Sequence, residues 1–332
     1  MATTRNPVWA VLLVAGVISG IGIRMAMAQG VDNFPSRPIV VVVPAEGSGT
    51  THMEMRLFAE SVKERTGKAI VVESKGGAGM TIGTAYVAKA RPDGYTLLVP
   101  SAAFAMGGAI YPNLPYDNIR DFEPITLLVK HVFLFLVHPS SPFKSMRDYI
   151  AYARTHPGEL NFSTSGLGGV THLCGELLHY MTKTNATFVH YKVSSQRLVD
   201  VTAGRVHASI TAPVSALPMI KAGRLRALGI TSAERIALLP DMPTIAEQGV
   251  PGFEYSSWVG LAAPARTPPA IINTLNEMWV QAVKDPGVIK KLEGDGTIMV
   301  GNTPAQFREF IVSETKRWHT VIKATGVKIE AD

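Results

Sequence analysis

The chain has 332 residues, of which 46% are hydrophobic and 17% are charged, and its formal net charge is +6. This composition excludes a disordered chain, and the length is sufficient for two domains. The positive excess is small: without Arg5 and Arg24, which lie in a leader-like segment, it falls to +4, and no run of Lys and Arg exceeds two residues. The charge pattern therefore argues against a nucleic-acid-binding protein.

Residues 1–28 have the pattern of a cleaved secretory signal peptide. Arg5 is followed by an uncharged apolar stretch over residues 8–23 and by Ala26-Met27-Ala28, whose small residues suit a cleavage site. As a helix this stretch would rise about 24 Å, less than the roughly 30 Å of a bilayer core, which disfavours a membrane anchor. The single cysteine, Cys174, is far from the cleavage site. We therefore expect a periplasmic protein without lipidation or an internal disulfide.

The first half of the mature chain alternates strands, short loops and helices. A β-branched run over residues 39–43 predicts a strand buried on both faces. The same rhythm predicts further strands at 69–73, 95–99 and 132–138, and helices at 52–66 and 81–90. Residues 111–121 are expected to form a loop-rich segment, and residues 139–142 a boundary. The pattern is typical of an α/β unit.

The same alternation of strands and helices continues in the second half and predicts a second α/β unit. The expected helices are 146–155, 171–181, 196–203, 269–284 and 304–325, and the expected strands are 160–163, 187–189, 208–211, 225–230 and 258–263. The joins fall near 134–142 and 252–260. The chain would thus leave domain 1 (32–135 plus 258–332), build domain 2 (136–257) and return. Such a double crossover leaves a cleft that closes by hinge motion, with strands 132–137 and 258–263 as hinges.

Signatures of catalysis are absent from the sequence. The run Gly77-Ala78-Gly79 lacks the third glycine of a dinucleotide loop, and Ser163 stands where a nucleophile elbow around Ser165 requires glycine. His172 and His179 are seven residues apart, too far along a helix for a paired metal site. We expect no cofactor and no metal.

Small residues recur in four loops that each follow a predicted strand and precede a helix. The loops are 46–51, 76–81, 101–105 and 165–169. Glycine permits close approach of a ligand to the backbone, and the amides at a helix start favour an anion. Three charge-assisted hydrogen bonds of about 1.5–3 kcal/mol each correspond to affinity on the order of micromolar. The loops predict the binding of a small anion rather than catalysis.

Short motifs spread over the mature chain resemble one family, the periplasmic solute-binding subunits of tripartite tricarboxylate transporters, also called the Bug family. The motifs are Phe34-Pro-Ser-Arg-Pro-Ile39, Gly77-Ala-Gly79, Arg91-Pro-Asp-Gly-Tyr-Thr-Leu-Leu98, Leu114-Pro-Tyr-Asp117, Pro157-Gly-Glu-Leu-Asn161, Tyr191-Lys192, Ala222-Gly-Arg-Leu-Arg-Ala-Leu228 and Leu239-Pro-Asp-Met-Pro-Thr244. The resemblance implies a type II-like two-domain periplasmic-binding-protein fold with an interdomain ligand cleft. It also implies a monomer that captures a small carboxylate and makes transient contact with membrane permease subunits.

The resemblance also implies which residues bind the ligand. In the first domain these are Ala45, Glu46, Gly49, Thr50, Gly79, Met80, Ser101, Ala102 and Trp258, and in the second domain Ser165, Gly168, His172, Tyr191 and Thr211. Trp258 is expected near the base of the cleft, with a place in the core as the alternative.

Several positions depart from the family pattern. His52 replaces an Asp, Val193 replaces a Gly, Thr211 replaces an Asp, and Glu46 stands where a small residue is common. A carboxylate at Glu46 would repel an anionic ligand unless it faces solvent, is neutralised by His52 or Lys75, or meets a donor group on the ligand. Two other functions stay open: a sensor that presents its closed form to a receptor, and a hydrolase that uses Ser165 and His172.

Overall fold

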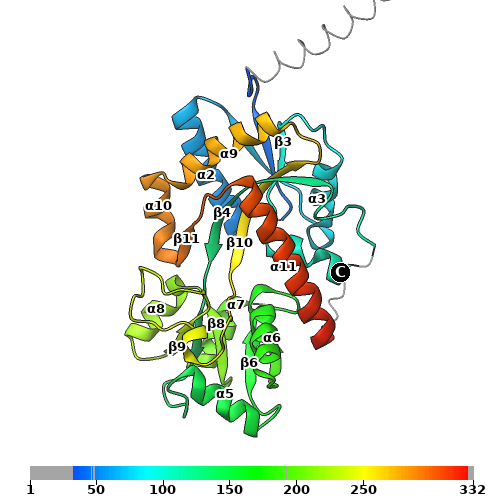
Figure 1. The fold of residues 1–332 in the computed structure, drawn as a ribbon. Coiled ribbons are helices and arrows are strands. Elements are labelled where there is room, and N and C mark those ends of the chain that lie inside the picture. The colour runs from blue at the N-terminus through cyan, green and yellow to red at the C-terminus, as the bar shows by residue number, and fades with distance from the viewer. Residues whose placement is uncertain (1–32, 46, 48, 112, 192, 328–332) are drawn as a thin grey trace, which may run out of the picture.

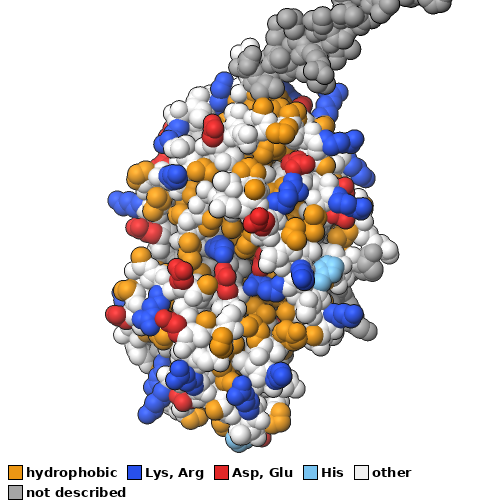
Figure 2. All heavy atoms as spheres, viewed as in Figure 1, with side chains coloured by type: hydrophobic (Ala, Val, Ile, Leu, Met, Phe, Trp, Pro, Cys, Tyr) orange, Lys and Arg blue, Asp and Glu red, His pale blue; other side chains and the backbone are white. Residues whose placement is uncertain are grey.

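The computed structural model describes residues 33–45, 47, 49–111, 113–191 and 193–327. The expected leader over residues 1–28 and the predicted ligand contact Glu46 lie outside these ranges. Two sheets follow one another along the long axis of the molecule, each flanked by helices (Figure 1). In the described part of the chain, no helix combines the length and apolar character that crossing a bilayer requires. Basic and acidic side chains are interspersed on the face in Figure 2.

The first sheet has six strands in the order β11-β4-β10-β3-β1-β2. They are β1 (Ile39–Val43), β2 (Ile70–Ser74), β3 (Thr96–Leu98), β4 (Phe122–His131), β10 (Ser257–Pro264) and β11 (Thr297–Met299). β1 is parallel to β2 and β3, whereas β10 is antiparallel to both β3 and β4.

Helices cover both faces of the first sheet. They are α2 (Thr50–Thr66), α3 (Thr81–Ala88), α4 (Ala102–Ile110), α9 (Pro269–Val283), α10 (Pro286–Leu292) and α11 (Pro304–Thr325). Val41 packs in one core cluster with Phe58 and Trp279, and Val42 packs in the other with Phe104. The β-branched run of β1 is therefore buried on both faces, as predicted.

The second sheet has five strands in the order β7-β6-β8-β5-β9. They are β5 (Leu134–Val137), β6 (Asn161–Thr164), β7 (Thr187–His190), β8 (Ala208–Thr211) and β9 (Arg226–Ile230), with helices α5 (Met146–Thr155), α6 (Val170–Thr182), α7 (Ser194–Thr202) and α8 (Pro213–Lys221). β6 is parallel to β7 and β8, and β5 is antiparallel to β8 and β9.

The chain changes sheet twice, and Thr231 joins the two crossings. The first crossing is at Val132 and Phe133, between β4 and β5, and the second is the segment 231–256 between β9 and β10. The Phe133 amide donates to Thr231 Oγ1 at 2.9 Å, and the Thr231 amide donates to the Phe133 carbonyl at 2.9 Å. The double crossover of the expected fold is present.

The expected domain boundary and one expected hinge strand differ from what the pairing of the strands shows. The expected domain boundary between residues 135 and 136 falls inside β5, all of which pairs in the second sheet. The expected hinge strand 258–263 lies within β10, which belongs to the first sheet. An apolar run in the sequence does not show where the chain stops pairing in one sheet and begins to pair in the other. The sequence alone therefore gives these boundaries inaccurately.

A buried histidine makes the second domain sensitive to acid. His179 of α6 is 4% exposed, and its ring nitrogens lie 2.7 Å from Thr184 Oγ1 and 3.4 Å from the Tyr149 hydroxyl. Burial lowers the pKa of His179 to about 4. Because the unfolded chain binds this proton more readily, the contribution of His179 is complete above pH 6.5 and is lost as the pH falls towards 4.

We expect the free energy of unfolding to fall by about 2 kcal/mol between pH 7 and pH 5 through this one group. Urea unfolding of the wild type and of His179→Gln at both pH values measures it. The variant should show a drop that is smaller by that amount, whereas His319→Gln, which changes an exposed histidine, should match the wild type. An equal drop in wild type and His179→Gln would contradict the assignment.

Candidate functional site

The predicted loops lie at the edges of the two sheets that are turned towards each other: those after β1, β2 and β3 on the first sheet, and that after β6 on the second. β4 runs towards the second sheet, and β3 and β1 run in the same direction because both β4 and β3 are antiparallel to β10. β5 runs away from the first sheet, so β8 and β6, which have the opposite direction, run towards it. The carboxyl ends of β1 and β3 therefore point at those of β6 and β8, where such folds bind ligands.

The loop after β1 leads into the start of α2. Gly49 is the N-cap of α2 in an extended conformation, and both Gly49 and Thr50 are exposed, while Ala45 is half-buried. His52, in the first turn, is 9% exposed and its Nδ1 lies 2.8 Å from Ser74 Oγ at the end of β2. His52 thus joins α2 to the neighbouring strand, and the exposed backbone of 49–50 is left at the helix start.

The loop after β2 has an unusual backbone. Four successive residues have positive φ: Gly77 at 117°, Ala78 at 45°, Gly79 at 60° and Met80 at 76°. Only glycine adopts such angles without strain, so Ala78 and Met80 are held there by their surroundings. A Cβ on Gly79 would lie 1.9 Å from the Tyr111 hydroxyl, so this position admits glycine alone in the present arrangement.

The loop after β2 contacts the segment after β3, where Ser101 is the only residue of the predicted loop 101–105 that precedes α4. Ser101 Oγ donates to Met80 Sδ at 3.7 Å, and Ser101 also bridges to Val259 of β10. Ser101 is half-buried, while Ala102 is 4% exposed, so Ala102 offers its backbone rather than its side chain. The segments after β2 and β3 are thus joined in the first-domain half of the site.

The loop after β6 is held by side chains of α6. The Ser165 amide donates to Thr171 Oγ1 at 2.7 Å, and the Gly168 amide donates to His172 Nδ1 at 3.0 Å. Because Nδ1 accepts this hydrogen bond, it carries no proton, so Nε2 is the protonated ring nitrogen and lies 3.2 Å from Glu176 Oε1. His172 is 2% exposed. It therefore positions the loop and has no nitrogen left for the predicted ligand contact.

The same bonds remove the basis of the hydrolase alternative. The Ser165 hydroxyl lies 3.0 Å from Thr171 Oγ1, and His172 is bonded to Gly168 and Glu176 instead of to Ser165. A serine nucleophile requires its base within hydrogen-bond reach. Ser165 itself is exposed and remains suited to donating a hydrogen bond to a ligand.

The three other predicted residues of this group, Tyr191, Thr211 and Trp258, lie in different surroundings. Tyr191 donates its hydroxyl to Asp200 Oδ2 at 2.7 Å, and removal from water together with this carboxylate raises the pKa of Tyr191 to about 12. Thr211, at the end of β8, is 7% exposed. Trp258 is 0% exposed and packs against Phe307 and Phe310 of α11. The structure thus places Trp258 in the core, the alternative to the cleft base.

Sequence reasoning missed Arg197 of α7. Its side chain is 4% exposed, and Nη1 donates to Ser209 Oγ and to the Ile210 carbonyl of β8. Burial lowers the pKa of Arg197 to about 10, which leaves it charged at neutral pH. In the sequence it looks like a surface residue of an amphipathic helix, although its spacing of four from the buried Val201 places it on the packed face.

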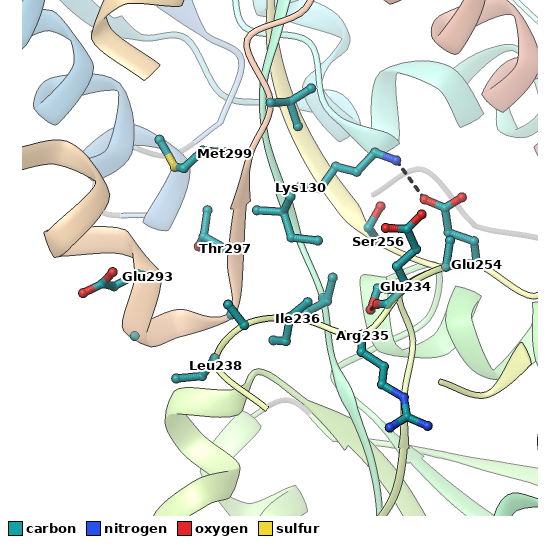
Figure 3. A pocket seen from close by; sticks show the side chains of 18 residues that line it. Lys130, Glu234, Arg235, Ile236, Leu238, Glu254, Ser256, Glu293, Thr297 and Met299 are labelled. Atoms are coloured by element: carbon teal, nitrogen blue, oxygen red, sulfur yellow. Dashed lines mark hydrogen bonds and ion pairs between the residues drawn. The ribbon is translucent and has the colours of Figure 1, made fainter. Parts of the chain in front are cut away.

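A separate cavity of about 980 Å³ lies between β11 and the two segments in which the chain changes sheet (Figure 3). Its positive side chains are already paired: Lys130 Nζ lies 2.8 Å from Glu254, and Arg235 lies 3.0 Å from Glu247. Glu234 and Glu293 also line it. This cavity is less suited to an anion than the strand-end loops. Nowhere among the described residues do three or more His, Cys, Asp or Glu side chains cluster as a metal site would require.

Comparison with known proteins identifies the family. The sequence model described as "Tripartite tricarboxylate transporter family receptor" matches residues 54–327, which include the loops after β2, β3, β6 and β8. The chain belongs to this receptor family. The resemblance seen in the sequence is thereby confirmed, and the family consists of solute-binding proteins rather than enzymes.

Individual relatives are similar to this chain along nearly its whole length. Protein BugT of Bordetella pertussis is 35% identical over 321 residues, covering 95% of this chain and 98% of BugT. The solved structure of Rhodopseudomonas palustris Rpa4515 with adipate has a TM-score of 0.71 at 35% identity, covering 89% of this chain and 99% of that one. MatC from the same organism, with bound malate, has a TM-score of 0.68 at 31% identity, covering 87% and 100%. The receptor therefore has the expected two-domain periplasmic-binding-protein fold.

Proposed function

We propose that this receptor captures a small organic carboxylate between its two domains and delivers it to the membrane permease of a tripartite transporter. The observation that carries the proposal is the opposition of the strand-end loops: those of β1 and β3 point at those of β6 and β8. A ligand bound to both sets of loops joins the domains and favours the closed form.

The groups at these loops suit carboxylate oxygens. Backbone amides near Gly49 and Gly79 and the hydroxyls of Thr50 and Ser165 are donors, and each charge-assisted bond contributes about 1.5–3 kcal/mol. Adipate and malate, bound to the two solved relatives, are both small dicarboxylates. We infer the same ligand class here, with Ala45, Met80, Ser101, Ala102, Tyr191 and Thr211 completing the walls.

The place of action follows from the leader and the family. The signal-like pattern over residues 1–28 supports export to the periplasm, where a monomeric receptor meets permease subunits transiently. The proposed hinge is Val132–Phe133 together with the segment 231–256, because the chain changes sheet there. These parts of the proposal rest on the sequence pattern and on family membership.

A thermal-shift screen of the mature protein tests the ligand class. The panel contains short mono-, di- and tricarboxylic acids, with hydroxylated and amino-substituted members, and their neutral amides. The correct acid at 100 times its Kd should stabilise the protein by about 2.7 kcal/mol, and its amide should have no effect. If no acid raises the melting temperature, or if amides do so equally, the proposal is contradicted.

A further inference from the structure

We propose that Arg197 is the positive charge of the ligand site and neutralises one carboxylate of the bound ligand. The inference rests on the proposed function and extends it by naming a residue that sets the charge preference of the same site. It depends on three features of Arg197: its place at the strand ends, its unused donors, and its lack of a carboxylate partner.

Arg197 lies beside the loops that form the second-domain half of the site. α7 begins at Ser194, shortly after Tyr191, whose amide donates to the Thr164 carbonyl at the end of β6. The Arg197 side chain reaches across to Ser209 and Ile210, next to Thr211 at the end of β8. The guanidinium therefore lies against the last residues of β8, whose carboxyl end faces the first domain.

The guanidinium retains donors that the described part of the chain does not use. Nη1 makes both of its bonds to β8, while Nε is buried and has no hydrogen-bond partner. Nε and Nη2 form the side of the guanidinium that binds a carboxylate with two parallel hydrogen bonds. A buried donor without a partner is unfavourable, and a ligand carboxylate at this edge would remove that cost.

The positive charge has no counter-ion among the described residues. The acid one turn further along α7, Asp200, accepts from the Tyr191 hydroxyl at 2.7 Å and from Arg205 at 3.0 Å, so it is already occupied. Buried charges are ordinarily paired. An arginine that is 4% exposed and lacks a carboxylate is therefore best explained by an anion that arrives with the ligand.

The test measures how Arg197 discriminates between an acid and its amide. Wild type, Arg197→Gln and Arg197→Lys are titrated calorimetrically with adipate, malate and the corresponding monoamides and diamides. Arg154→Gln removes a charge from an exposed position on α5 and serves as the matched control. Circular dichroism and urea unfolding are used to check that each variant is folded.

We expect Arg197→Gln to weaken binding of the better dicarboxylate by about 10- to 150-fold, the range of a charge-assisted hydrogen bond, and to reduce the preference for acid over amide by the same factor. Arg197→Lys, which keeps the charge without the planar fork, should fall between. Arg154→Gln should bind as the wild type does. This pattern requires a charge that acts on the carboxylate.

Other outcomes separate failure of the inference from failure of the function. If the wild type binds an acid and a folded Arg197→Gln binds it equally well, the inference is overturned and the function stands. If Arg197→Gln weakens acids and amides alike, Arg197 only supports the strand ends and the inference again falls. If Arg197→Gln does not fold, Arg197→Lys decides by its preference for acid over amide, and an unchanged preference overturns the inference. If the wild type binds no acid, the proposed function fails and the inference fails with it.

Discussion

Gly83→Ala is expected to destabilise the protein by about 3 kcal/mol and to abolish ligand binding. Gly83 is buried in α3, and a Cβ on it would lie 2.5 Å from the Lys75 carbonyl oxygen and 2.9 Å from Pro44 Cα. Both neighbours are backbone atoms at the ends of β2 and β1. The added methyl group must therefore push apart the loops that form the first-domain half of the site.

Urea unfolding and titration with the identified acid measure the two effects. The matched control is Gly107→Ala in α4, where the nearest atom to the new Cβ is a Leu114 methyl carbon at 3.4 Å. The control should change stability by no more than about 1 kcal/mol, since alanine is also the better helix former. A Gly83→Ala protein with wild-type stability and affinity would show that α3 does not set the spacing of these loops.

Trp258→Ala is expected to lower the free energy of unfolding by about 3–5 kcal/mol. Trp258 is fully buried, with its ring centroid 5.8 Å from that of Phe307 and 5.4 Å from that of Phe310. The substitution leaves a cavity between β10 and α11, the helix that contacts both α4 of the first domain and α6 of the second. Urea unfolding measures the loss, and Trp258→Phe should cost less than half as much.

The same residue distinguishes a core role from a ligand contact. Any change in tryptophan emission on ligand binding should persist in Trp258→Phe, and the affinity of that variant should equal that of the wild type. Loss of the emission change, or an affinity reduced tenfold or more in a stably folded Trp258→Phe protein, would contradict the core role and indicate that Trp258 contacts the ligand.

Much of the fold could be predicted because local patterns agree with the tertiary structure. The β-branched run of β1 is buried on both faces, and the helices α5 and α11 begin at the capping boxes of Ser145 and Thr303. The sequence patterns predict neither β4 nor α8, because each contains a proline whose local effect is overridden by tertiary contacts. α8 contains Pro218, and β4 contains Pro124, which pairs with Ala262 next to a register shift where a missing amide is tolerated.

The sequence predicts which loops form the candidate site, but it does not predict which contacts the side chains of the site make. Small residues after each strand locate the loops, because parallel strands bring their carboxyl ends to one edge. The role of His172 depends on its bonds to Gly168 and Glu176, and that of Arg197 on its burial against β8. These contacts join residues whose side-chain directions the sequence does not give.

The central claim is that the facing loops bind a carboxylate as an anion. Calorimetric titration of the mature wild-type protein with its best dicarboxylate and with the matching neutral diamide tests this most directly. We predict a Kd on the order of micromolar or tighter for the acid, and binding of the diamide at least about 100-fold weaker, because charge-assisted bonds to the loops are lost. Equal affinity for acid and diamide, or no binding of any small carboxylate, would contradict the account.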